Sequence, residues 1–186
     1  MKTNLGSIAT LRSGIYAKPE RIGVVRYLQA GNFDASGTYD DTLQPDLQID
    51  QRLSHHLLQP NDILLVAKGA RNVSVAYRET MGDAIASSIF MVIRISQPDV
   101  VTPEYLVWFL NHPQSQDYFK SESRGSGIPS LNQQSVENLP VFIPSLEKQR
   151  AIAVYSELTR RENALRHRLD GLRDQMNQTL LLNAIR

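Results

Sequence analysis

Cysteine is absent from this chain of 186 residues, and that absence excludes several kinds of chemistry at once. There can be no disulfide framework, no thiolate metal site and no cysteine nucleophile. Apolar runs of about 18 residues are missing as well, so no segment is expected to span a membrane. The opening Met1–Asn4 leads into no apolar run, so we expect no signal peptide. These absences suit the reducing cytoplasm, which is the location we predict.

Motifs that accompany common catalytic sites are lacking too. The chain has no phosphate-binding loop, no glycine fingerprint for a dinucleotide or S-adenosylmethionine, and no nucleophile elbow around Ser87-Ser88. None of its five lysines follows an acidic residue by two positions, a step with which many nucleases hold a metal. The adjacent His55 and His56 have no partner at metal-ligand spacing and are expected at the surface. We predict no enzymatic activity, no metal site and no cofactor; the alternative is a small DNA-processing enzyme with dispersed metal ligands.

An excess of charge of one sign is also missing. The net charge is +1, and residues 1–145 carry 12 basic against 14 acidic side chains, a net of −2. Residues 146–186 carry 8 basic against 5 acidic side chains, a net of +3. This balance argues against a non-specific nucleic-acid binder. Any contact with DNA must therefore come from local basic clusters.

Residues 1–145 are expected to form one mixed domain, because hydrophobic residues make up 41% of the chain and turn signals punctuate this part. Four apolar runs predict strands, namely 24–28, 63–67, 85–95 as a central strand, and 139–143. A threonine and a proline at 102–103 predict a helix start, and a second helix should follow the break at 111–113. The aromatic residues at helical spacing, expected in the core, are Trp108, Phe109, Tyr118 and Phe119.

The chain changes character after Pro144. Residues 146–186 contain no proline and one glycine, and their apolar residues follow a heptad pattern that Glu162 interrupts. A helix of this length would measure about 60 Å at ~1.5 Å per residue, too long to be buried along a domain of this size. We therefore predict a projecting helix that pairs with a second copy; a terminal helix folded back onto the core is the alternative. The predicted interface residues are Tyr155, Leu158, Leu165, Leu169, Leu172 and Met176.

Five segments carry the motifs of a known family. In chain order they are Asn4–Gly14, Arg26–Phe33, Leu58–Gly69, Pro103–Leu106 and Leu139–Ile152. Together they resemble the DNA specificity subunits of type I restriction-modification systems. The last matches the family's short strand, proline turn and E-x-Q-x-x-I helix start. In the third, Pro60-Asn61 replaces the glycine that commonly precedes the aspartate. Family members typically carry this unit twice, whereas one copy is present here, so the resemblance implies a half-length form that pairs with itself.

The resemblance implies an α+β recognition domain over 1–145 and a dimerising, subunit-docking helix over 146–186. The chain would read one half of a bipartite target in double-stranded DNA without catalysing a reaction. Separate methyltransferase and restriction subunits would be its partners, with itself as a homodimer. A scaffold module that dimerises through its helix and never meets DNA is the rival interpretation, which the charge balance of residues 1–145 favours.

Candidate DNA contacts are cations and amides on loops, since base edges and phosphates are read by such groups. The first cluster lies on a glycine loop between two strands, and a solvated hairpin tip is its alternative interpretation. The second lies in and after a glycine-serine loop, expected to be flexible, and the third precedes Arg26. The candidates are Lys68, Gly69, Arg71 and Asn72; then Arg124, Ser126 and Asn132; then Arg12, Lys18 and Arg21.

Overall fold

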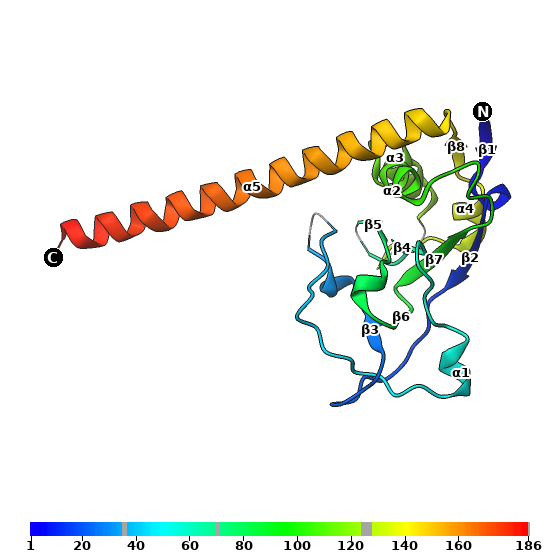
Figure 1. Cartoon of the computed structure of the whole chain (residues 1–186), viewed down its shortest axis with the longest axis horizontal. Helices are drawn as coiled ribbons and strands as arrows, with labels where there is room; N and C mark the ends of the chain where they lie inside the picture. Colours follow the sequence, from blue (N-terminus) through cyan, green and yellow to red (C-terminus); the bar gives the residue numbers. More distant parts are fainter. Residues whose placement is uncertain (35–36, 70, 124–127, 186) are drawn as a thin grey trace.

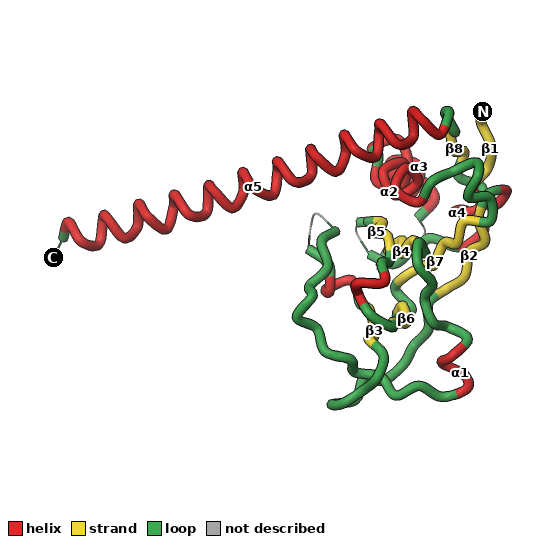
Figure 2. Tube along the Cα trace, in the orientation of Figure 1, coloured by secondary structure: helices red, strands yellow, loops and turns green. Residues whose placement is uncertain are grey.

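Short, mainly apolar strands build a four-stranded antiparallel sheet at the centre of the protein. The structure is a computed structural model that describes residues 1–34, 37–69, 71–123 and 128–185 (Figures 1 and 2). The strand order is β2-β7-β4-β5, and Ile93 of β7 lies between Leu11 of β2 and Ile63 of β4. The four strands are β2 (Ala9–Ser13), β4 (Ile63–Val66), β5 (Ser74–Ala76) and β7 (Phe90–Ile95).

Both faces of this sheet are covered, which explains why its strands are continuous apolar runs. Ile63 and Ile93 belong to a core shared with the helices, whereas Leu64 and Val92 belong to a core on the opposite face. The helices of the first face are α2 (Pro103–Asn111), α3 (Pro113–Glu122) and α4 (Gln133–Glu137). The second face is covered by a parallel strand pair, β3 (Arg26–Leu28) and β6 (Ala84–Ala86). The result is the predicted α+β fold.

The smaller elements complete the chain. A further pair joins β1 (Lys2–Asn4) to β8 (Pro140–Phe142), so the first strand lies beside the last. The short helices are η1 (Leu5–Ser7), η2 (Ala30–Asn32), α1 (Gln51–Ser54) and η3 (Glu79–Met81).

The single central strand predicted over 85–95 is wrong. The chain turns at residues 87–90, where the Phe90 amide donates to the Ser87 carbonyl at 3.0 Å. Residues before the turn form β6, which pairs with β3, and residues after it form β7 of the main sheet. Ser87-Ser88 at the turn was the one polar signal of the break, and it was weak because the residues on either side of the turn are buried.

The predicted helix start at Thr102 is confirmed. Its hydroxyl accepts from the Tyr105 amide at 3.4 Å, and Pro103 occupies the first turn. His112 ends α2 and begins α3, where its Nδ1 accepts from the Gln114 amide at 3.3 Å. The four aromatic residues predicted for the core lie in or against it: Phe109 and Phe119 are buried, and Trp108 and Tyr118 are half-buried.

Asn61 takes the conformation that the missing glycine would have supplied. Its φ is 71°, in the left-handed region that asparagine tolerates better than most residues. The turn places Asp62 directly before β4, where its side chain is 1% exposed. The Asp62 carboxylate accepts hydrogen bonds from Arg94 Nε and Nη2, both at 2.7 Å. Asp62 also accepts from the Gln59 amide at 2.9 Å. This ion pair fixes the start of β4 against β7.

Replacing Asp62 by asparagine is expected to lower the free energy of unfolding by about 1.5–3 kcal/mol, the range for hydrogen bonds to charged groups. The loss should fall near the lower end, because the Arg94 side chain is 37% exposed and water compensates part of it. Urea denaturation measures this difference. The exposed Asp99→Asn, which removes the same charge, is the matched control; equal losses in the two variants would contradict a specific role for the pair.

The helix α5 (Leu146–Ala184) is 39 residues long and projects far from the rest of the protein (Figure 1). Ser145 caps it, with its hydroxyl accepting from the Lys148 amide at 3.5 Å. Ile152 packs against the core, but residues 161–185 are all exposed. The alternative of a terminal helix folded back onto the core is therefore wrong.

Candidate nucleic-acid interface

The loop between β4 and β5 presents two cations at the surface. Lys68 and Arg71 are exposed, and Gly69 has a φ of 133°, which disfavours any side chain. The base of the loop is rigid, because the Asn72 amide donates to the Val66 carbonyl at 2.8 Å. Asn72 is buried, so this side chain supports the loop rather than facing solvent.

The structure brings the first candidate cluster beside residues 129–131, which directly precede Asn132. The Gly69 amide donates to the Pro129 carbonyl at 3.0 Å, and the Leu131 amide donates to the Ala67 carbonyl at 2.8 Å. Lys68 and Ser130 form an isolated antiparallel bridge between these two bonds. The sequence separates these segments by about sixty residues, and their adjacency follows from the fold.

The remaining members of the second cluster have different positions. Arg124 and Ser126 lie outside the described residues. Asn132 is exposed, but its side chain caps α4 by accepting from the Ser135 amide at 2.7 Å. Its carboxamide therefore has a structural partner already.

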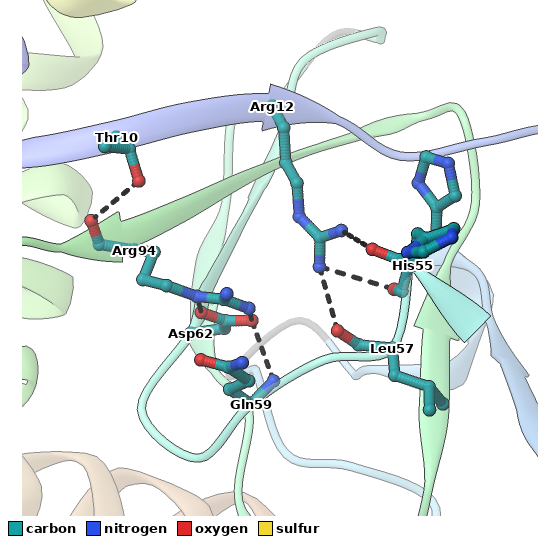
Figure 3. A network of polar contacts seen from close by, with 8 residues as sticks. Thr10, Arg12, His55, Leu57, Gln59, Asp62 and Arg94 are labelled. Carbon is teal, nitrogen blue, oxygen red and sulfur yellow. Dashed lines mark hydrogen bonds and ion pairs between the residues drawn. The ribbon is translucent and has the colours of Figure 1, made fainter. Parts of the chain in front are cut away.

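Arg12 is engaged by the protein itself (Figure 3). Its Nη1 donates to the His55 carbonyl at 2.9 Å, and its Nη2 donates to those of His56 and Leu57 at 3.3 and 3.0 Å. These carbonyls follow α1, so the guanidinium holds this segment against β2. Burial, and next the neighbouring Arg94, lower the pKa of Arg12, although Asp62 partly offsets this.

Lys18 and Arg21 are exposed on a different part of the surface. Their segment runs beside residues 45–47, to which Gly23 and Val24 donate backbone hydrogen bonds of 3.1 and 2.8 Å. The same segment exposes Ile22, whose side chain is 76% accessible. None of the hydrogen bonds given above links the segment of Lys18 and Arg21 to the loop that carries Lys68 and Arg71.

A groove of about 1270 Å³ is lined by α2, α5, β5 and residues 37–41. Four arginines that the sequence did not group line it: Arg71, Arg78, Arg160 and Arg161. Asp41, Glu104 and Glu157 line it as well, so its charge is mixed. Arg160 crosses the groove, donating to Glu157 at 2.9 and 3.0 Å and to the Thr38 hydroxyl at 2.9 Å.

The predicted interface residues form an uncovered apolar stripe on α5. Their exposed fractions are 74% for Tyr155, 58% for Leu158, 67% for Leu165, 48% for Leu169, 55% for Leu172 and 57% for Met176. Glu162, which interrupts the stripe, is bound within the helix by Arg166 at 2.6 Å. An exposed apolar stripe with a heptad repeat is typical of a helix that forms a coiled coil.

Within the described residues, no group of three or more histidine, aspartate or glutamate side chains is placed to hold a metal ion. The same part of the chain contains no helix with the length and apolar character needed to cross a membrane.

The chain thus combines a central sheet, covered on both faces, with one long projecting helix. The family model of the type I restriction modification DNA specificity domain matches residues 36–167. The chain therefore belongs to this family. No curated protein matches the sequence.

Solved structures share the fold. The type I restriction-modification system S subunit from M. genitalium has a TM-score of 0.60 at 14% identity, and the match covers 83% of this chain and 37% of that one. The HsdS subunit from Thermoanaerobacter tengcongensis has a TM-score of 0.62 at 16% identity, covering 91% and 39%. A chain described for the complex assembly and conformational transition of the type I R-M system gives 0.62 at 16%, covering 92% and 40%. The chain thus spans about two fifths of the length of these structures.

Proposed function

We propose that this chain is the DNA-reading specificity subunit of a type I restriction-modification complex and acts as a homodimer in the cytoplasm. Residues 1–145 would grip one half of a bipartite target, and residues 146–186 would pair with the second copy. Methyltransferase and restriction subunits of the same system would supply the chemistry. The observation that carries the proposal is the family match, which spans most of the recognition part and the first half of α5.

We place the DNA contacts on the two loops that the sheet brings together. Lys68 and Arg71 are exposed cations on a loop whose base is held by a hydrogen bond from Asn72. A loop held in this way loses little conformational entropy when its cations bind phosphates. Lys18 and Arg21 remain candidates for a separate contact. Arg12, Asn72 and Asn132 already bind protein groups, so we assign them to loop support instead.

The dimer model follows from symmetry. Two identical readers related by a two-fold axis require half-sites related by the same axis, so the target should be an inverted repeat. Antiparallel pairing of α5 would place the readers at opposite ends. Because the helices are long, unread base pairs should separate the half-sites, with centres on the order of one to two DNA turns apart.

Mapping of modified adenines in cells tests the proposal. The chain is expressed with the methyltransferase subunit of its system, and the modified sites are read by single-molecule sequencing. The expected result is one split, inverted-repeat motif that disappears when this chain is deleted. A continuous asymmetric motif, or a motif that persists after the deletion, would exclude the proposed role.

The rival scaffold function predicts a different result in a gel-shift assay. A specificity subunit should bind random DNA at low salt and release it at high salt, because phosphate contacts displace counterions. A scaffold should not bind at either salt concentration. Family membership favours the specificity subunit over the scaffold.

The isolated protein is expected to catalyse neither methyl transfer nor cleavage, because the sequence carries none of the motifs for these reactions. The purified chain is incubated with DNA and labelled S-adenosylmethionine, and separately with plasmid and Mg²⁺. A control without the protein should give neither incorporated label nor cut plasmid. Either product in the presence of the purified chain would favour the alternative of an enzyme with dispersed metal ligands.

A further inference from the structure

Gln149 is buried on a helix whose other described residues are exposed or half-buried. Of the α5 residues that the structure describes, it alone is buried, with no measurable exposure. Glutamine in a surface helix is normally exposed, since burying an amide is unfavourable unless its groups are paired. A buried glutamine in the first turn of α5 therefore indicates that its amide has specific hydrogen-bond partners in the protein.

The amide joins α5 to two other segments, the residues just before α2 and the proline just before α5 itself. Its Oε1 accepts from the Thr102 amide at 2.9 Å, at the cap of α2. Its Nε2 donates to the Val100 carbonyl at 2.8 Å and to the Pro144 carbonyl at 3.0 Å. Both amide hydrogens and one oxygen lone pair are thus used. The Tyr105 hydroxyl, donating to the Phe142 carbonyl, ties α2 to β8 next to this junction.

A second attachment lies eleven residues further along α5. Arg160 donates to the Thr38 hydroxyl at 2.9 Å across the groove described above. At ~1.5 Å per residue the two attachments are about 16 Å apart along the helix axis. Two fixed points define the direction of a helix, and Gln149 is the one at its root.

We propose that Gln149 is the positioning residue that sets the angle between α5 and the recognition part, and thereby the separation of the two half-sites. The second clause rests on the proposed function. About 35 residues of helix follow Gln149, so a tilt of about 10° at the root would move the far end by about 9 Å. At ~3.4 Å per base pair, this corresponds to two or three base pairs of spacer.

The chemistry of the side chain explains why glutamine is needed. Glutamate has the same shape but offers no donor to the two carbonyls, and at neutral pH it would place a negative charge against them. Alanine leaves three backbone groups, at Val100, Thr102 and Pro144, without their partner. Either change should loosen the root of the helix without altering the DNA-contacting loops.

The test uses the absence of cysteine, which allows two labels to be placed cleanly. Glu20→Cys and Asn177→Cys, both at exposed positions, carry a dye pair for single-molecule energy transfer, diluted into unlabelled protein. Gln149→Glu and Gln149→Ala are expected to shift or broaden the distance distribution by about 5–10 Å, the lever-arm displacement of a small tilt. Gln178→Glu, the same change at an exposed position of the helix, should leave it unchanged.

The adenine map supplies the second measurement. The Gln149 variants should relax or change the number of unread base pairs while the half-site sequences stay the same. Fluorescence of the single tryptophan, Trp108, checks that the recognition part is folded. If a Gln149 variant does not fold, Arg160→Ala, which releases the attachment to Thr38 and the ion pair with Glu157 but leaves Gln149 in place, carries the same expectation.

Unchanged distances and unchanged spacers in folded variants would overturn the inference. Shifted distances in a protein that reads no bipartite target would overturn the spacer clause together with the proposed function, while supporting the positioning role. The two failures are therefore distinguishable.

Discussion

A variant carrying Leu165→Asp and Leu172→Asp is expected to be a monomer that no longer binds a bipartite target. Both leucines lie on the uncovered stripe of α5, with exposed fractions of 67% and 55%. Nothing else in the described chain covers this part of the helix, since residues 161–185 are exposed throughout. In the dimer model their partner is the stripe of the second copy.

The expected effect is large because each substitution counts twice in a two-fold dimer. Burying a leucine stabilises by about 1.5–3 kcal/mol, and this gain is lost at four positions. A buried carboxylate without a partner adds a further penalty of several kcal/mol. Glu162 does not create the same penalty in the wild type, because Arg166 binds it within the helix.

Light scattering measures the mass of each variant at high concentration. His167→Asp with Asn177→Asp adds the same number of aspartates away from the stripe and is the matched control; it should remain a dimer. A wild-type protein that is monomeric at high concentration, or a doubly substituted protein that is still dimeric, would refute pairing through α5.

Lys68→Ala combined with Arg71→Ala is expected to weaken DNA binding strongly while leaving the fold intact. Each charge-assisted contact contributes about 1.5–3 kcal/mol, so two lost contacts amount to at least a hundredfold in affinity. The logarithmic dependence of affinity on salt should become shallower by roughly one unit for each lost contact per chain. Stability should change by less than about 0.5 kcal/mol, because both side chains are exposed.

Titrations at several salt concentrations, paired with thermal melts, measure these quantities. Lys148→Ala with Arg150→Ala removes one lysine and one arginine from exposed positions at the start of α5 and is the matched control. Equal losses in the two double variants would mean that overall charge, not this loop, governs binding. A lowered melting temperature in the loop variant would show that the loop is structural.

The fold could be predicted from the sequence wherever local signals agreed. The threonine cap and Pro103 marked the start of α2, and the absence of proline with sustained heptads marked α5. The break between β6 and β7 was not predicted, because Ser87-Ser88 at the turn is a weak turn signal within an apolar run that is buried on either side of it. Which strand each half joins depends on partners elsewhere in the chain.

The candidate site, like the fold, was predictable from the sequence only where local signals were present. The sequence by itself determined that the chain carries a mixed domain, a long helix with an apolar stripe and cations on glycine loops, since helix caps, heptads and turn residues act between near neighbours. Only the tertiary structure decided what the individual side chains do. Arg12 binds carbonyls more than forty residues away, and Gln149 binds Val100 at a similar separation. The adjacency of Gly69 and Pro129 likewise depends on how the sheet is assembled. Hydrogen-bond partners that meet only through packing leave no spacing pattern in the sequence, so their roles appear only when the core has formed.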